Sequence, residues 1–198
     1  ASWWANTMDP SLDVAKQGAL HAIVGTLVIG LITSVISIPI ALLTAIFLVE
    51  YARGTKIAKV VSFAVDVLTG VPSIVAALFI YALWITILGQ QRSGFAVSLS
   101  LILLMVPVVV RNTEEMLRVV PMDLREASYA LGVPKWKTIA RIVLPTALSG
   151  IVTGIMLAVA RIMGESAPVL VLVGSTSSIH WDPFKGAQSS LPLMMLDM

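Results

Sequence analysis

The chain has 198 residues, of which 58% are hydrophobic and only 12% are charged, and its mean hydropathy is +0.95. Soluble domains average roughly 45–50% apolar and about 25% charged residues, so this composition excludes a water-soluble fold and a disordered chain. The absence of cysteine excludes disulfide scaffolds and thiolate metal sites. The net charge of +2 has a topological explanation and does not indicate a nucleic-acid partner. The composition predicts an all-α polytopic membrane protein.

Four apolar stretches reach, or nearly reach, the roughly 20 residues that a helix needs to cross a bilayer core. We expect helical spans over residues 21–49, 60–88, 95–110 and 146–174. Pro39 predicts a kink in the first span, and Gly70-Val71-Pro72 predicts a break in the second. The third stretch has only 16 residues, so it crosses the bilayer only with polar residues at its ends.

The orientation follows from the 13 basic residues, because short cytoplasmic loops are enriched in Lys and Arg. Nine lie in segments 50–59 and 111–145, three lie in the other segments between or beyond the spans, and Arg161 lies inside a span. Both chain ends are thus predicted on the outer, periplasmic side. We also expect an external loop over 175–190, and missing spans before residue 1 and after residue 198.

The cytoplasmic connection over 111–145 is long for a compact membrane protein, which indicates a function. Its pattern predicts two short helices, over 122–131 and 135–144, that lie across the inner face and are hinged at Gly132. Pro145 is expected to mark the start of the last span. On chemistry alone, this segment could equally be a basic amphipathic region that rests on anionic lipid.

Glu126-Ala127-Ser128, then Gly132, then Ile142-Val143-Leu144-Pro145 have the spacing of the EAA loop of ABC importer permeases, with Ser128 in place of the second Ala. The chain therefore resembles a single type I, MetI-like importer transmembrane domain over 1–198, with 111–145 as its coupling loop. The resemblance implies that Glu126, Ala127 and Gly132 form the contact with a separate ATPase and the bend of the loop, while Ile142, Leu144 and Pro145 anchor the loop to the following span. No G-x-x-x-x-G-K-[ST] sequence occurs in the chain, so ATP and Mg are expected in that partner, with no cofactor and no metal in this chain.

Charged residues inside the predicted spans cost at least about 2.5–3.5 kcal/mol each, so they are retained for pairing or for function. Arg161 and Glu165 stand four residues apart, which predicts an ion pair on one helix face. Pro168 is expected to open the helix just beyond them. Arg111 is either an anchor at the inner boundary or a basic station for an anion, and Asp66 is interpreted as a solvated end residue.

The string from Ala160 to Pro168 is similar to the Ala-Arg-x-x-Gly-Glu-Thr-Ala-Pro segment of the A-type permeases of bacterial phosphate-specific ABC systems, with Ser166 for Thr. This resemblance implies an inorganic phosphate path that includes Arg111, Arg161 and Glu165, in a bacterial inner membrane. It also implies the partners: a homologous C-type permease, two cytoplasmic ATPase subunits, an external phosphate-binding protein and membrane lipid.

Other functions stay open at this point. The same transporter could carry another oxyanion, such as molybdate or sulfate, because an Arg-Glu pair does not fix the cargo. A secondary transporter, a channel or a simple membrane anchor could contain the same charges. An enzyme is least supported, since His21 and His180 are the only histidines and no nucleophile–base or metal-ligand spacing accompanies them.

Overall fold

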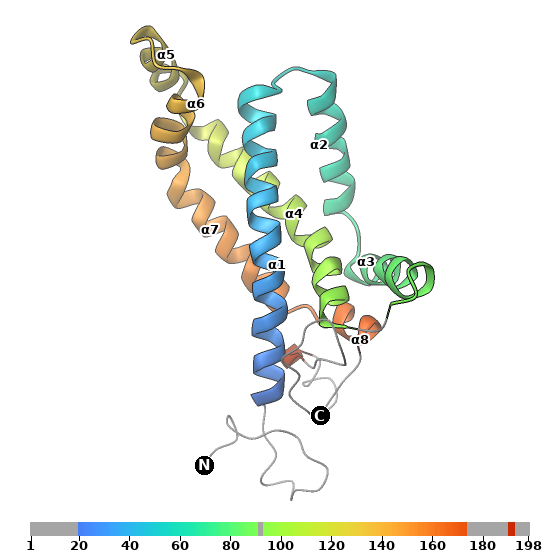
Figure 1. Ribbon diagram of the computed structural model, residues 1–198. Helices are drawn as coiled ribbons and strands as arrows, with labels where there is room; N and C mark the ends of the chain where they lie inside the picture. Colours follow the sequence, from blue (N-terminus) through green and yellow to red (C-terminus); the bar gives the residue numbers. More distant parts are fainter. Residues whose placement is uncertain (1–19, 91–92, 174–189, 193–198) are drawn as a thin grey trace, which may run out of the picture. The chain divides into compact units, whose positions relative to one another are not determined.

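The computed structural model describes residues 20–90, 93–173 and 190–192, and no strand occurs within them (Figure 1). The helices are α1 (Leu20–Ile46), α2 (Lys56–Thr69), α3 (Ser73–Ile80), α4 (Gly94–Val119), α5 (Met122–Ala130), α6 (Lys135–Thr138), α7 (Leu144–Met163) and α8 (Ala167–Leu172). Three π-helical segments continue them: η3 (Phe47–Tyr51), η4 (Tyr81–Ile87) and η5 (Ile139–Val143). The predicted all-α fold is confirmed. The predicted external loop over 175–190 lies outside the described residues, except for Ser190.

Three helical runs are long and apolar enough to cross a membrane: Ala22–Tyr51, Gly94–Val119 and Lys135–Met163. The first agrees with the sequence-based span. The second predicted span is broken, as expected, at the Gly70-Val71-Pro72 sequence, and it counts as a fourth candidate only if α2 and α3 with η4 are taken together. The third is longer than predicted, because the helix continues past residue 110 to Val119. Arg111 therefore lies inside a helix and not at its end.

The last long run begins at Lys135 and not at residue 146, so the prediction of a separate short helix over 135–144 is wrong. Proline has no N–H to donate and its ring conflicts with the carbonyl four residues earlier. Here the five residues from Ile139 to Val143 form a π-helical turn just before Pro145, which loosens the ladder where the proline enters it. The helix then continues to Met163. The break expected near Pro168 is confirmed, since α8 starts afresh at Ala167.

The chain packs as two units, to which α1, α4 and α7 each contribute a segment. Unit 1 comprises Ala1–Ile36, Val71–Met105 and Val159–Met198, and unit 2 comprises Ser37–Gly70 and Val106–Ala158. In unit 1, α3 packs against α8 through buried small and branched residues such as Ala77 and Leu172. The Trp84 and Phe95 rings also pack together in unit 1, with their centroids 5.5 Å apart.

The core of unit 2 joins the end of α1 to α4 and α7. Its buried members are Val49, Leu117, Val120, Val143, Ala147 and Ile151. Two glycines of α7 allow close packing on α4: Gly150 lies against the side chain of Met116, and Gly154 lies against the amide of Asn112. Asn112 Nδ2 also donates a hydrogen bond to the Gly150 carbonyl, at 3.4 Å. This packing holds the part of α4 that carries Arg111.

Replacing Gly154 with alanine is expected to lower the free energy of unfolding by about 1–3 kcal/mol, because the new Cβ would overlap the Asn112 amide. Val152→Ala, on an exposed part of the same helix, is the matched control. Thermal unfolding of the purified protein in detergent measures both variants. Equal midpoints for the two variants would contradict the close packing of α7 on α4.

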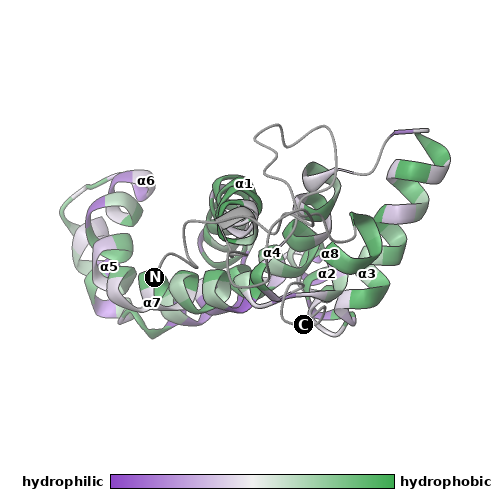
Figure 2. Cartoon of the chain, turned by 90° about the horizontal axis from the view of Figure 1, so that it is seen from below, coloured by the Kyte–Doolittle hydropathy of each residue, from purple (hydrophilic) through white to green (hydrophobic). Residues whose placement is uncertain are grey.

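The outward face of the long helices is apolar. On α1, the exposed side chains include Leu27, Leu31, Val35 and Leu43, which repeat at helical spacing along one stripe. Figure 2 shows apolar colours over α1 and α3, whereas hydrophilic colours gather on α5 and α6. An apolar outer face suits a hydrocarbon environment, where the backbone polar groups are satisfied within each helix.

Candidate functional site

Arg111 lies at the centre of a charged cluster in unit 2, on α4. Its Nη1 donates to Glu114 Oε2 at 2.5 Å, and its Nη2 donates to Asp66 Oδ1, also at 2.5 Å. Nη2 also donates to the Ser62 carbonyl, at 2.8 Å. Glu114 reaches Arg111 because residues three apart share a helix face, and Asp66 and Ser62 come from α2. Two carboxylates therefore occupy the Arg111 guanidinium in this structure.

The two carboxylates differ in their surroundings. The side chain of Glu114 is 3% exposed, whereas that of Asp66 is 64% exposed. The interpretation of Asp66 as a solvated end residue was incomplete, because its carboxylate is exposed but is bound to Arg111. An exposed partner can be replaced by a solvent-borne anion more readily than a buried one, since the buried charge loses its only compensation when the contact breaks. Asp66 is thus the solvent-accessible counter-ion of Arg111, and Glu114 is the buried one.

The predicted ion pair between Arg161 and Glu165 is not formed. Helix α7 ends at Met163, so Glu165 lies beyond the helix and does not follow Arg161 on one face. The salt bridges within the described part of the chain involve Arg111 and Arg125 only. Gly164 and Pro168 account for the difference, since they end one helix and start the next. Arg161 is exposed in the last turn of α7.

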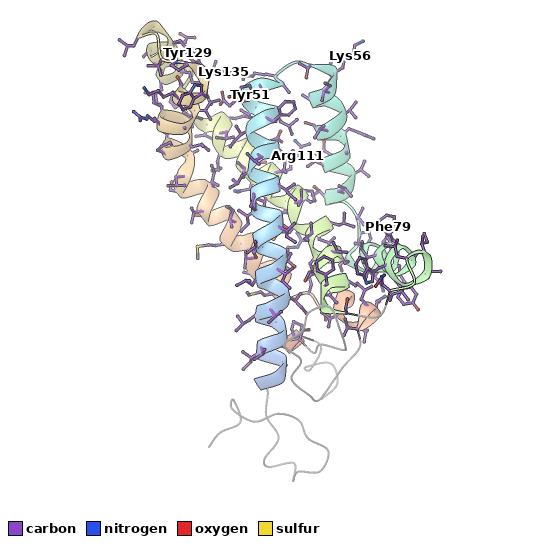
Figure 3. All side chains as sticks on the ribbon, in the orientation of Figure 1. Tyr51, Lys56, Phe79, Arg111, Tyr129 and Lys135 are labelled. Atoms are coloured by element: carbon purple, nitrogen blue, oxygen red, sulfur yellow. The ribbon has the colours of Figure 1, made fainter. Side chains whose placement is uncertain are left out.

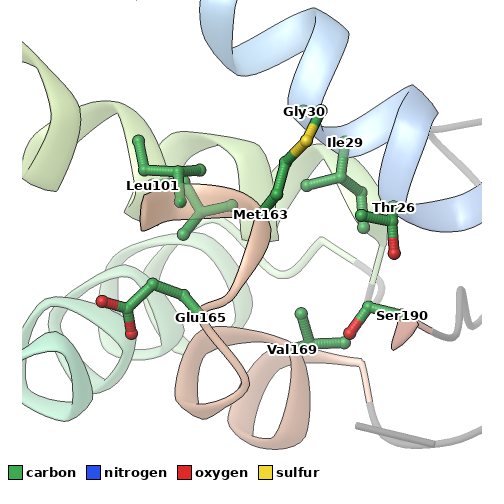
Figure 4. Close-up of a pocket in the computed structure, with 9 residues that line it drawn as sticks. Thr26, Ile29, Gly30, Leu101, Met163, Glu165, Val169 and Ser190 are labelled. Carbon is green, nitrogen blue, oxygen red and sulfur yellow. The ribbon is translucent and has the colours of Figure 1, made fainter. Parts of the chain in front are cut away.

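Glu165 lines a small cavity in unit 1, together with Thr26, Gly30, Met163 and Ser190 (Figure 4). The cavity measures about 10 Å³, which is room for roughly one water molecule. In Figure 4 the Glu165 carboxylate points away from Thr26. A tetrahedral oxyanion does not fit this cavity in the observed state.

The elbow, which we define as residues 122–145, begins with α5 and turns sharply at Gly132. Gly132 has φ +74°, and the turn is closed by hydrogen bonds from Val133 N–H to the Ser128 carbonyl and from Gly132 N–H to the Tyr129 carbonyl. This pair of bonds is the Schellman motif, which needs a left-handed residue at the position of Gly132. The predicted glycine bend is confirmed.

The residues of the EAA pattern occupy different environments in the elbow. Glu126 and Ala127 are exposed on α5, and Pro145 is exposed on α7. Ile142 and Leu144 are half-buried. Ser128, the departure from the family pattern, is buried and shares a hydrogen bond of 2.8 Å with Thr138. Its hydroxyl thus ties α5 to α6 and does not face a partner.

Two basic residues tie the elbow to the end of α1. Arg125 donates to Glu50 Oε1 at 2.9 Å and to the carbonyls of Leu117 and Val120. Lys135 donates to the Glu50 carbonyl and lies over the Tyr51 ring, 5.1 Å from its centroid (Figure 3). Sequence reasoning missed the contacts to Glu50, since 75 residues separate it from Arg125 and no local pattern links them.

The elbow exposes large apolar side chains next to its charged residues: Met122, Leu124, Tyr129, Leu131 and Trp136. Leu131, at the tip of the turn, is 83% exposed. Exposed large apolar side chains among polar residues are typical of a surface that binds another protein or a membrane. Glu126 and Ala127 are also exposed, on α5.

Comparisons with known proteins identify the family and the fold of the chain. The family described as "Binding-protein-dependent transport system inner membrane component" matches residues 37–191. The chain is 57% identical over 196 residues to phosphate transport system permease protein PstA 1 of Mycobacterium tuberculosis, covering 98% of this chain and 63% of that protein. It is 54% identical to PstA of Mycobacterium leprae, over 98% of this chain and 64% of the relative. The chain thus spans slightly less than two thirds of these relatives.

Among solved structures, an inward-facing conformation of the MetNI methionine ABC transporter matches with a TM-score of 0.60 and 24% identity. The match covers 73% of this chain and 68% of that one. At this identity the likeness extends to the fold, and it confirms the MetI-like transmembrane fold expected from the sequence.

Proposed function

The chain belongs to the family of binding-protein-dependent transport system inner membrane components, and we propose that it is the A-type permease of an ATP-driven importer of inorganic phosphate. The observation that carries this proposal is the 57% identity, over 98% of the chain, to a permease of a phosphate transport system. The charged cluster at Arg111, set within an apolar helix, supports a path for an anion.

The phosphate path in this proposal includes Arg111, Arg161 and Glu165. At Arg111, phosphate oxygens replace Asp66 while Glu114 stays in place, because the guanidinium can donate two parallel hydrogen bonds to an oxyanion. In the observed state Asp66 occupies Arg111 and the Glu165 cavity is too small for phosphate, so in this proposal neither of these two positions holds the anion in this state. Movement of α2, which carries Asp66, would free the arginine.

The partners in this proposal are a C-type permease, two cytoplasmic ATPase subunits that bind ATP and Mg, an external phosphate-binding protein and membrane lipid. The elbow would dock in a groove of one ATPase subunit through Glu126, Ala127 and the apolar residues around them. Arg125 and Lys135 would pass the ATPase movement to the end of α1, since both bind Glu50. Both ends of the chain would then face the periplasm.

Gly132→Ala is expected to reduce ATP-driven uptake and to destabilise the elbow by about 1–2 kcal/mol, because alanine disfavours the left-handed conformation. Gly132→Asn is the matched control, since asparagine adopts this conformation more readily. Transport by the reconstituted complex and proteolysis of the elbow measure the two effects. Equal uptake by both variants and the natural protein would contradict the role of this bend in coupling.

The test of the proposed function is uptake of radiolabelled phosphate into liposomes that hold the full-length permease with its co-purified partners. ATP-dependent uptake that excess sulfate or molybdate does not compete is the expected result. If molybdate or sulfate competes at equal concentration, that oxyanion and not phosphate is the transported substrate. Uptake without the ATPase subunits would instead identify a secondary transporter or channel, and no uptake of any of these anions would overturn the proposal.

A further inference from the structure

A cavity in unit 2 lies beside the Arg111 cluster, with Glu114 in its wall. It measures about 270 Å³ and is bounded by η3, the turn after it, α2 and α4. Its charged residues are Arg53, Lys59, Arg118 and Glu114. Three positive side chains against one negative give the cavity an excess of two positive charges, which favours an anionic ligand.

The cations of this cavity have no carboxylate partner among residues 20–90, 93–173 and 190–192. None of the salt bridges there includes Arg53, Lys59 or Arg118. Arg53 makes only a weak contact from Nη1 to the Met122 sulfur, at 3.9 Å. A second cavity, of about 340 Å³, is also lined by Arg53 and Arg118, and there the other cations, Arg125 and Lys135, are bound to Glu50. Arg53 and Arg118 therefore remain free to bind an anion from either cavity.

Glu114 requires that the ligand of this cavity also carry a hydrogen-bond donor. Its Oε2 accepts from Arg111, while its Oε1 is buried and has no hydrogen-bond partner within the described residues. An ionised carboxylate can only accept hydrogen bonds, so the group that completes this site must be a donor. A buried acceptor without a donor costs about 1–3 kcal/mol, which a suitable ligand would recover.

We infer that this cavity binds a protonated tetrahedral oxyanion, namely hydrogen phosphate. Arg53, Lys59 and Arg118 donate to its ionised oxygens, and Glu114 Oε1 accepts from its P–OH group while Glu114 Oε2 keeps its bond to Arg111. The volume suffices, since a water molecule takes about 30 Å³ in the liquid and the cavity is several times larger. The site deepens the proposed function, because it adds a phosphate station next to Arg111, but phosphate binding to it does not depend on transport.

The Glu114 carboxylate makes this site selective for ligands that carry a hydroxyl group. Sulfate is fully ionised at neutral pH, so it would present an acceptor oxygen to the acceptor Glu114. A site that must bond a ligand hydroxyl rejects analogues without one, often by several orders of magnitude. The phosphodiester of a lipid headgroup also lacks a P–OH group, so a lipid bound here would use the arginines but not Glu114. Glu114 thus distinguishes free phosphate from sulfate and from a lipid headgroup.

The experiment measures binding of radiolabelled phosphate and sulfate to the full importer complex in phosphatidylcholine nanodiscs at neutral pH, without ATP. Glu114→Gln is expected to raise sulfate affinity and to lower the phosphate-to-sulfate preference at least about tenfold, because the amide can donate. Arg53→Gln with Arg118→Gln is expected to weaken binding of phosphate about tenfold or more. Lys56→Gln, which removes a neighbouring exposed cation of α2 that lines neither cavity, is expected to change neither affinity (Figure 3).

Three outcomes would overturn the inference. One is an unchanged phosphate-to-sulfate preference in Glu114→Gln, and another is unchanged phosphate binding in the double arginine variant, whose exposed positions leave folding intact. The third is loss of phosphate binding when anionic phosphatidylglycerol replaces part of the lipid, which would assign the site to a headgroup. Selective binding without ATP-driven uptake would retain this site while refuting the proposed function.

Discussion

Arg125→Met is expected to lower the free energy of unfolding by about 3–5 kcal/mol, because it leaves the Glu50 carboxylate buried without its counter-ion. The two side chains are only 8% and 6% exposed, so water cannot replace the lost contact. The variant also frees the carbonyls of Leu117 and Val120, which Arg125 binds at the junction between α4 and α5. Thermal unfolding in detergent and limited proteolysis of the elbow measure the change.

The double variant Glu50→Gln with Arg125→Met tests the cause of that loss. With neither charge present, most of the stability is expected to return, since replacing a buried ion pair by uncharged residues is often neutral. Arg141→Gln, an exposed change in the same elbow, serves as the control. If the double variant is as unstable as Arg125→Met, the lost carbonyl contacts and not the unpaired carboxylate determine the effect.

Arg111→Gln is expected to reduce phosphate uptake by about tenfold to a hundredfold, which corresponds to the roughly 1.5–3 kcal/mol of hydrogen bonds to a charged group. It is also expected to destabilise the protein by about 3–5 kcal/mol, because Glu114 is buried and loses its partner. Uptake by the reconstituted complex and thermal unfolding measure the two effects separately.

A second variant separates transport from folding at Arg111. Arg111→Gln with Glu114→Gln removes both buried charges, so it is expected to restore the unfolding temperature but not the uptake. Asp66→Asn removes the exposed counter-ion of Arg111. It is expected to leave the free energy of unfolding nearly unchanged, since Asp66 is largely exposed. Normal uptake by a stable Arg111→Gln, Glu114→Gln protein would remove Arg111 from the phosphate path.

Local backbone chemistry explains what the sequence predicts correctly. Gly132 adopts the left-handed conformation expected of a bend. The breaks near Pro72 and Pro168 occur because proline cannot continue a hydrogen-bond ladder from the preceding helix. The apolar runs locate three of the four predicted spans, and the fourth counts only if the bent pair of α2 and α3 with η4 is taken as one span.

The errors arise where distant contacts or helix ends decide the outcome. Asp66 and Arg111 are 45 residues apart, so nothing in the sequence alone pairs them. The pairing of Glu114 with Arg111 is predictable from their spacing of three residues on one helix. The predicted third span ends at residue 110, so it does not contain this pair. The pairing of Arg161 with Glu165 assumed an unbroken helix through Gly164, where the helix in fact ends.

The π-helical turn at Ile139–Val143 allows one span to contain Pro145 and also the two glycines, Gly150 and Gly154, that contact α4. In this turn the Leu144 N–H bonds to the Ile139 carbonyl, so the turn takes up one residue more than an α-helical turn while the flanking segments keep their rotational phase. Deleting Ala140 would close it into ordinary α-helix and leave Gly150 and Gly154 facing α4. Pro145 would then press on a ladder carbonyl and kink the span. The extra residue thus lets the helix continue past the ring of Pro145 to Met163.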